Sequence, residues 1–179
     1  MSIRFAVPAD APAIAALHAD SWRRHYRGAY ADSFLDGDVL ADRLAVWSAR
    51  LATGSVETRT VVAERDGRLL GFVHLVVADD PVWGSLVDNL HVVHDQHRSG
   101  IGTTLLSRVA REVRGPIHLW VLRQNTAAQA FYRAVGGRVA EVRTVAPPGG
   151  DPARLRGTPE KLRMTWPDAA ILAGRDPGV

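Results

Sequence analysis

A glycine-rich turn at residues 97–103 constrains the fold of this chain more than any other segment. Its sequence, His-Arg-Ser-Gly-Ile-Gly-Thr, follows an extended apolar run at residues 85–93. A helical pattern of apolar residues, with Leu105, Leu106 and Val109, begins directly after it. The turn therefore leads from a strand into the N-terminus of a helix. Free backbone N–H groups and the positive end of a helix dipole bind phosphate there, so the sequence predicts a site for a phosphorylated ligand.

The turn departs from the two best-known phosphate motifs. Leu105 stands where the third glycine of a dinucleotide fingerprint would be. The lysine of a P-loop is missing too, because Ile101-Gly102-Thr103 replaces Gly-Lys-Ser/Thr. By itself the turn is equally compatible with an ordinary strand-to-helix connection that contains two glycines.

The order of the expected elements predicts an α/β fold. Strands are expected at residues 3–7, 57–64, 68–78, 85–93, 117–122, 138–145 and 161–166, and Asp66-Gly67 is a strong hairpin signal. Helices are expected at residues 10–18, 39–47, 100–114 and 126–135, with an irregular aromatic stretch at 21–36 and a flexible loop at 146–159. This order predicts a mixed sheet with helices on both faces, antiparallel at first and with parallel neighbours after residue 85.

The length of 179 residues suits one domain, which we place at residues 1–166. Residues 167–179 are expected to be a loosely attached C-terminal tail.

Composition narrows the classes of function. The chain has no cysteine, which excludes disulfides, thiolate metal sites and a cysteine nucleophile. No apolar run is long enough to span a bilayer, and the first residues show no signal-peptide pattern, so no membrane association and a cytoplasmic location are expected. The pI is about 9.9, but the net charge is only +3 and the arginines are spread among acids. No basic stripe interleaved with aromatics is present, so nucleic acid is not expected as a partner.

A second block of sequence changes the interpretation of the turn. The expected strand at residues 117–122 is followed by Asn125, Ala128, Phe131, Tyr132 and Gly136 in a helical pattern. Together with the glycine turn, this block resembles the GNAT superfamily of N-acetyltransferases, and the resemblance covers residues 85–145 well. The stretch at residues 21–28 also looks like bacterial members. The resemblance implies a mixed, mostly antiparallel sheet of about six to seven strands, splayed between the strands at 85–93 and 117–122.

The resemblance also implies transfer of an acetyl group from acetyl-CoA to a primary amine. The turn then corresponds to the family's pyrophosphate loop, and residues 125–132 to its second cofactor-binding helix. The implied cofactor-binding residues are Leu90, Val92, Val93, His97, Arg98, Ser99, Gly100, Ile101, Gly102, Thr103, Thr104, Asn125, Ala128, Phe131 and Tyr132. The backbones of Val92 and Val93 and the side chain of Asn125 would bind the pantetheine arm, although Asn125 also suits a helix cap.

One position departs from the family pattern. The family usually has Gln or Arg where this chain has His97. The backbone N–H groups, rather than that side chain, are therefore expected to bind phosphate, with Arg98 as an additional positive charge.

Two residues are candidates for the chemistry. The resemblance places the hydroxyl of Tyr132 beside the CoA sulfur as a proton donor, and the alternative is a core aromatic. Asp88 is the candidate base, directly or through water, or an anchor for a cationic substrate; the alternative is a polar residue on a half-exposed strand. His91 is a rival to Asp88. Strand alternation puts these two side chains on opposite faces unless a bulge intervenes.

His91, His94 and His97 also suggest a metal site, but a strand leading into a turn does not hold that spacing on one face, and no metal is expected. The aromatic residues near the N-terminus have two interpretations: they line an acceptor pocket together with Asp88, or they form a packed corner between two helices. The substrate-binding candidates are Trp22, Tyr26, Tyr30 and Asp88, with Phe34 nearby. Arg23, Arg24 and Arg27 would favour an anionic acceptor there, or be solvated surface charges.

Three functions are consistent with these residues. The first is direct acetyl transfer in a ternary complex, to a small-molecule or protein amine. The second is a non-catalytic CoA-binding domain of the same fold, and the third is transfer from a longer acyl-CoA. A homodimer is compatible with the family, and the sequence does not identify the acceptor.

Overall fold

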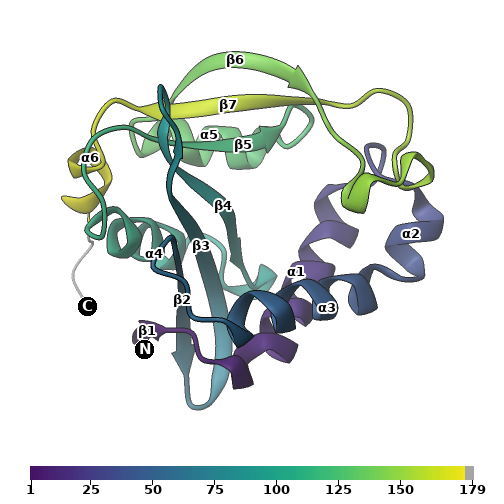
Figure 1. Cartoon of the computed structure of the whole chain (residues 1–179), viewed down its shortest axis with the longest axis horizontal. Helices are drawn as coiled ribbons and strands as arrows, with labels where there is room; N and C mark the ends of the chain where they lie inside the picture. The colour runs from purple at the N-terminus through teal and green to yellow at the C-terminus, as the bar shows by residue number, and fades with distance from the viewer. Residues whose placement is uncertain (176–179) are drawn as a thin grey trace.

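The computed structural model of the protein describes residues 1–175 (Figure 1). Its strands are β1 (Ser2–Phe5), β2 (Thr58–Arg65), β3 (Arg68–Asp80), β4 (Gly84–Val92), β5 (Ile117–Leu122), β6 (Arg138–Thr144) and β7 (Glu160–Trp166). Its α-helices are α1 (Ala11–His25), α2 (Asp32–Asp36), α3 (Val39–Ala52), α4 (Ile101–Ala110), α5 (Thr126–Ala134) and α6 (Ala170–Ala173).

The strands form one sheet in the order β1-β2-β3-β4-β5-β7-β6. Every neighbouring pair is antiparallel except β4 and β5, which run parallel. This confirms the mixed, mostly antiparallel sheet expected from the sequence. The parallel pairing is short, since it joins only Ser85–Val87 to Ile117–Leu119. Beyond it β4 and β5 diverge, which confirms the splay and leaves an opening between two halves of the sheet (Figure 1).

The two faces of the sheet are covered by different helices. Neighbouring residues of a strand point to opposite faces, so Val61 packs with α4 whereas Val62 packs with α1 and α3. Phe72 and Val73 divide in the same way, with Phe72 on the α1 and α3 side. The core on the α4 side continues along β5 and β7, with Leu119 and Met164 among its residues. On the α1 side, β5, β7 and β6 extend beyond these helices (Figure 1).

The region expected to be irregular, at residues 21–36, is partly helical. Helix α1 continues to His25 because Trp22 lies four positions after the buried His18 and extends the same buried stripe. Its end is followed by Gly28, which has a φ of 87°. The short α2 then forms, so only the connection between the two helices is irregular.

Two helices differ from their expected form. The sequence pattern predicts that Val39, Leu40, Leu44 and Trp47 share one face of α3. Val39 and Trp47 are buried, whereas Leu40 and Leu44 are exposed. Helix α4 ends at Ala110 rather than at residue 114. The N–H of Glu112 donates to the carbonyl of Val109, a tighter turn that closes the helix early.

The segment after β7 is not loosely attached as far as residue 175. Ala169 and Leu172 are buried in the core beside α4. The hydroxyl of Ser107 donates to the carbonyl of Ala173 at 2.9 Å, which ties α6 to α4. The sequence signal was missed because the contact is made by only a few apolar residues in and directly before a very short helix. The rest of the expected tail, residues 176–179, lies outside the described residues.

Candidate active site

The turn before α4 presents an array of free backbone donors. Gly100 is the N-cap of α4 with a left-handed φ of 86°, and Arg98 has a φ of 66°. Within residues 1–175, the N–H groups of Arg98 and Gly100 and of the first helical turn, residues 101–103, donate to no backbone or side-chain acceptor. An array of N–H groups at a helix N-terminus fits an anionic diphosphate. The residues present therefore fit the cofactor that the sequence implies.

Gly102 also allows a close approach of two helices. A Cβ atom at this position would lie 3.2 Å from Cζ of Phe131 on α5. The side chains of Ile101 and Thr104 are buried, and the Thr104 hydroxyl donates to the carbonyl of Gly100 at 3.3 Å. These two residues therefore support the turn through packing. Ile101 leaves its backbone N–H to face a ligand, whereas the N–H of Thr104 donates to the carbonyl of Gly100 at 3.0 Å.

The edge of β4 that faces the opening keeps backbone groups unpaired by β5. The N–H of Val93 donates to the carbonyl of Leu70, on the β3 side. Because backbone direction alternates along a strand, Leu90 and Val92 turn their peptide groups toward the open edge. The carbonyl of Val92 accepts a hydrogen bond from Nε2 of His97 at 3.2 Å. His97 thus holds the turn against β4 at the position where it departs from the family pattern.

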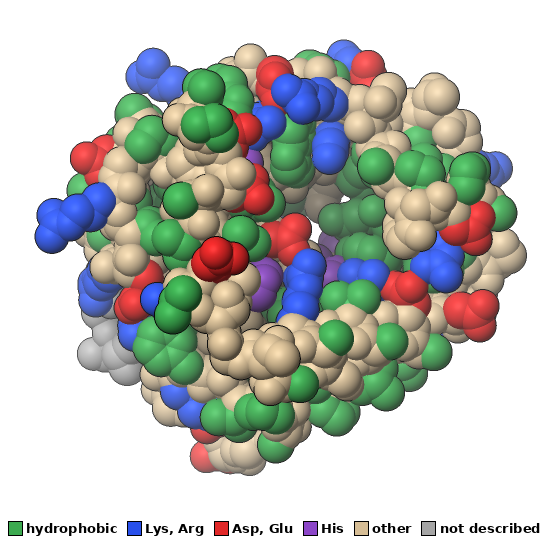
Figure 2. Space-filling model, in the orientation of Figure 1, with side chains coloured by type: hydrophobic (Ala, Val, Ile, Leu, Met, Phe, Trp, Pro, Cys, Tyr) green, Lys and Arg blue, Asp and Glu red, His purple; other side chains and the backbone are tan. Residues whose placement is uncertain are grey.

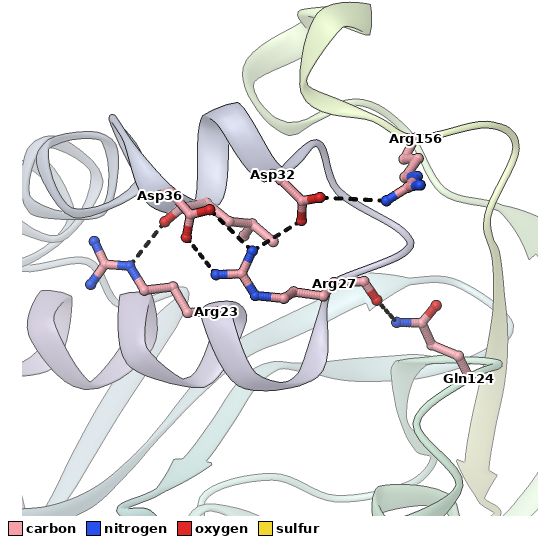
Figure 3. Close-up of polar contacts among 7 residues, drawn as sticks. Arg23, Arg27, Asp32, Asp36, Gln124 and Arg156 are labelled. Atoms are coloured by element: carbon pink, nitrogen blue, oxygen red, sulfur yellow. Dashed lines mark hydrogen bonds and ion pairs between the residues drawn. The ribbon is translucent and has the colours of Figure 1, made fainter.

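Asn125 caps α5, as one of its two expected roles requires. Its Oδ1 accepts the N–H of Ala128 at 3.1 Å. The side-chain amide of Asn125 makes no donor contact within the described part of the chain, so it is available to a ligand at the opening. The neighbouring Gln124 donates from Nε2 to the carbonyls of His25 and Arg27, at 3.1 and 2.8 Å. Figure 3 shows the contact with Arg27. The start of α5 is therefore joined to the end of α1 across the opening.

A β-bulge places Asp88 at the opening. Leu75 pairs with Val87 and His74 pairs with Asn89, so Asp88 is the extra residue of the ladder. A bulge lets consecutive side chains share a face. Nη1 of Arg50 on α3 lies 2.9 Å from Oδ2 of Asp88 and donates to Oδ1 of Asn89 at 3.0 Å. Both residues therefore face α3, and Asp88 is the first residue of β4 beyond its pairing with β5.

His91 shares this side of β4 but is packed inward. Its Nδ1 lies 2.8 Å from the Ser21 hydroxyl, and its ring is 4.5 Å from that of His18 and 5.2 Å from that of Phe72. Burial lowers the pKa of His91 to about 3, so the ring is neutral at physiological pH. A weak base surrounded by rings is a poor candidate to take a proton from a substrate. Asp88 is the better placed of the two rivals.

Tyr26 interacts electrostatically with this carboxylate, and Tyr132 interacts with Tyr26. Burial, followed by the charge of Asp88, raises the pKa of Tyr26 to about 12. Burial, followed by the influence of Tyr26, raises the pKa of Tyr132 well above its ordinary value. Tyr132 is 8% exposed and packs beside Trp166, and its hydroxyl makes no hydrogen bond within residues 1–175. Both phenols keep their protons at neutral pH and can act as donors.

The other aromatic candidates form a packed corner. Trp22 and Tyr30 are each 7% exposed, with ring centres 5.0 Å apart. They pack with Phe34 in one cluster, and Arg43 lies 4.3 Å over the ring of Trp22. Of the expected acceptor-pocket aromatics, Tyr26 is therefore the one with an electrostatic link to Asp88.

The arginines of the same region are engaged with partners of their own. Arg27 pairs with Asp32 at 3.0 Å and with Asp36, and Arg156 lies 3.4 Å from Asp32 (Figure 3). Arg23 donates to the carbonyl of Leu35, and Arg24 pairs with Asp20. These contacts fix α2 and the loop after β6 to the end of α1. Arg24 and Arg27 are therefore paired with carboxylates, whereas Arg23 donates only to a backbone carbonyl.

A different basic group was missed by the sequence analysis. Three basic side chains lie over the ring of Trp120 on β5. Nζ of Lys161 on β7 is 4.5 Å from the ring centre, and the Cζ atoms of Arg163 on β7 and Arg143 on β6 are 4.3 and 5.7 Å from it. Leu119 faces the α4 core, so strand alternation turns Trp120 to the α1 side. Figure 2 shows this face hollowed between the two halves of the molecule, with basic, acidic and histidine side chains around the hollow. The alternation of polar and apolar residues in β7 could have indicated that Lys161 and Arg163 share one face of the sheet.

Comparison with known proteins agrees with this geometry. Residues 15–136 match the acetyltransferase (GNAT) family, and the chain belongs to that family. It is thus an acetyl-CoA-dependent acyltransferase.

Individual relatives are distant. A probable N-acetyltransferase of Mycobacterium tuberculosis is 27% identical over 137 residues, which cover 73% of this chain and 75% of the relative. The PaiA N-acetyltransferase of Thermoplasma acidophilum, solved in complex with coenzyme A, superposes with a TM-score of 0.68 at 19% identity, covering 92% of this chain and 98% of that one. YncA of Salmonella typhimurium, solved with acetyl-CoA, gives 0.64 at 21% identity, with 93% of both chains covered. Similarities at this level establish the fold.

Membrane-spanning helices and metal-binding groups were both expected to be absent. No helix within residues 1–175 is both long and apolar enough to cross a membrane. In the same residues, no group of three or more histidine and carboxylate side chains is arranged to hold a metal ion. His91 turns toward Ser21, whereas the rings of His94 and His97 lie 5.1 Å apart in the turn.

Proposed function

We propose that this protein transfers the acetyl group of acetyl-CoA to a primary amine by direct attack in a ternary complex. The observation that carries the proposal is the position of Asp88 at the fork between β4 and β5. The free N–H groups of the turn at residues 98–103 lie at the end of the same strand. A cofactor bound along the open edge of β4 would therefore pass from the turn toward Asp88.

Different residues of this chain bind the cofactor and transfer the proton. The turn at residues 98–103 binds the diphosphate through its N–H groups, and the peptide of Val92 and the amide of Asn125 hold the pantetheine arm. Acetyl-CoA supplies an activated acetyl group as a thioester. Asp88, with Oδ2 held by Arg50, attracts the protonated amine and accepts a proton from it, directly or through water.

Tyr132 completes the proton balance. As the bond from nitrogen to the acetyl carbon forms and the carbon–sulfur bond breaks, the departing thiolate needs a proton. The hydroxyl of Tyr132 keeps its proton at neutral pH because burial raises its pKa. It is therefore able to supply that proton. The second proton that the nitrogen loses as the amide forms returns to the phenolate, directly or through water, and Asp88 releases the first proton to solvent. An acyl-enzyme on cysteine is excluded because the chain has none.

Release of CoA in the presence of acetyl-CoA and a panel of amines tests the proposal. A thiol reagent reports the release without background from the protein, since it contains no cysteine. We expect amine-dependent CoA release with an acetylated product of matching mass. Acetyl-CoA binding measured by calorimetry without turnover of any amine would contradict the proposal. A faster reaction with butanoyl-CoA or a longer acyl-CoA would mean that the protein transfers a longer acyl group rather than acetyl.

A further inference from the structure

The wall opposite Asp88 carries an unmatched positive charge. Glu141 on β6 binds Arg163 at 2.7 Å and Arg143 at 3.0 Å, and Arg163 also donates to Nδ1 of the buried His118. Lys161, by contrast, makes no hydrogen bond or ion pair within residues 1–175. Three cations therefore surround Trp120 with one carboxylate between them.

Register places this free charge at the fork. Lys161 pairs with Leu122 on β5, whereas the pairing of β5 with β4 ends at Leu119. Lys161 is thus beside the part of β5 that has separated from β4. On the opposite strand, Asp88 is the first residue after the last paired position, Val87. The two residues interact electrostatically, because the charge of Asp88 is among the influences on Lys161.

The side chain of Lys161 is held in place without being neutralised. Its Nζ lies 4.5 Å from the centre of the Trp120 ring, and the residue is half-buried. Burial, followed by the charges of Arg143 and Arg163, lowers its pKa. An ammonium group in this position gains from an oxyanion, which would offset both the loss of water and the repulsion by its neighbours.

We propose that Lys161, supported by Trp120 and Arg143, binds an oxyanion of the acceptor, so that the acceptor is an amine that also carries a carboxylate or a phosphate. This inference rests on the proposed function and adds the substrate class. Asp88 would hold the amine end and Lys161 the anionic end, which orients the acceptor across the fork. Charge at two ends of a cleft favours acceptors with the complementary pair.

Because Lys161 is the only lysine of the chain, its charge state and binding can be observed directly. Reductive methylation with ¹³C-formaldehyde labels this side chain and the N-terminal amine, which gives two resolved reporters. At constant ionic strength, 4-aminobutanoate, O-phosphoethanolamine and inorganic phosphate should each shift the Lys161 signal saturably and raise its titration midpoint. 1-Aminobutane should not. Equal shifts of both reporters, or no saturable shift with any oxyanion, would overturn the proposal.

Selectivity gives a second readout. For 4-aminobutanoate against 1-aminobutane, and for O-phosphoethanolamine against ethanolamine, the ratio of kcat/KM should fall roughly tenfold in Lys161→Met and stay near the wild-type value in Lys161→Arg. The two pairs show whether carboxylate or phosphate is preferred. Arg65→Met, at the exposed end of β2, removes an equal charge far from the fork and should leave the ratio unchanged. An unchanged ratio in Lys161→Met would overturn the proposal.

The outcomes separate this inference from the proposed function. Turnover of amines without preference for anionic ones contradicts the role of Lys161 and leaves amine acetylation standing. A saturable shift of the Lys161 signal without turnover of any amine contradicts amine acetylation and leaves the anion site standing. Thermal melting of Lys161→Met shows whether this variant folds, and if it does not, the shift of the Lys161 signal in the labelled wild-type protein decides.

Discussion

Asp88 and Arg50 form an ion pair of 2.9 Å that joins β4 to α3 at the point where the sheet opens. The same guanidinium donates to Asn89 and lies 5.1 Å over the ring of Trp47. The bulge in β4 therefore has a firm partner on the helix that covers it. Arg50 fixes one oxygen of Asp88, and the other oxygen accepts no hydrogen bond within the described residues. That free oxygen is the natural contact for an amine.

Replacing Asp88 by Asn should lower kcat/KM for amine acceptors by about 100-fold, because Asn keeps the shape but neither attracts an ammonium nor accepts its proton. Calorimetry should show acetyl-CoA affinity within about twofold of wild type. Asp66→Asn is a matched control at the β2–β3 hairpin, where its φ of 52° suits Asn equally well. If Asp88→Asn acetylates amines at the wild-type rate, Asp88 has no part in catalysis.

Replacing Tyr132 by Phe should lower kcat by roughly 10- to 100-fold and leave the affinity for acetyl-CoA nearly unchanged. The hydroxyl makes no hydrogen bond within residues 1–175, and the ring contact with Trp166 is kept, so the melting temperature should stay close to wild type. Single-turnover kinetics at saturating acetyl-CoA measure the chemical step. Full turnover in this variant would show that another group, or solvent, protonates the thiolate.

Two glycines with the same strained backbone separate binding from stability. Gly100 before α4 and Gly67 in the β2–β3 hairpin have φ values of 86° and 75°. Alanine at either position should cost about 1–2 kcal/mol of unfolding free energy, because an L side chain is disfavoured there. Only Gly100→Ala should also weaken CoA binding, by roughly tenfold or more, since relief of strain moves the N–H groups of the turn. Equal CoA affinity in the two variants would argue against this turn as the diphosphate site.

The buried histidines predict acid sensitivity. His74 is 3% exposed and bonded to the Thr60 hydroxyl, and burial, followed by the charge of Arg50, lowers its pKa to about 4. The unfolded chain has a histidine pKa near 6.5 and therefore binds more protons than the folded chain between about pH 4 and 6.5. The neutral ring of His74 therefore contributes fully to the free energy of unfolding above pH 6.5. As the pH drops this free energy falls, by about 2 kcal/mol at pH 5.

Denaturant unfolding between pH 5 and 7.5 measures this effect. His74→Asn should flatten the dependence on pH, and the exposed His94→Asn should keep the wild-type slope. A wild-type protein with constant stability over this range would contradict the neutral state of the buried ring. His91, whose pKa burial lowers to about 3, should extend the loss to more acidic solutions.

Local signals explain which parts of the fold were predictable. The hairpin at Asp66-Gly67 forms with both residues at positive φ, as its sequence demands. The strand at residues 117–122 has the expected bounds, and the glycine turn leads into α4 at Ile101. Each of these features depends on a few adjacent residues whose backbone preferences agree. Helix ends depend on weaker and longer-range contacts, and α1 and α4 accordingly differ from expectation.

The candidate site was predictable only in part. The cofactor turn and Asn125 lie in contiguous segments, and the resemblance to the family placed them together. The wall of Trp120, Lys161 and Arg143 comes from three strands that are adjacent only in the order β5-β7-β6. No spacing in the sequence relates them.

The sequence by itself determined the strand-to-helix turn with its left-handed Gly100, the hairpin, and the absence of a cysteine nucleophile, because these follow from residue identity and local backbone preference. The tertiary structure decided the bulge that turns Asp88 toward Arg50, the burial of His91, and the position of Lys161 across the fork. These depend on which strands pair and where their pairing ends. Register is set by the packing of whole elements, and one extra residue in a ladder changes the face on which a side chain lies.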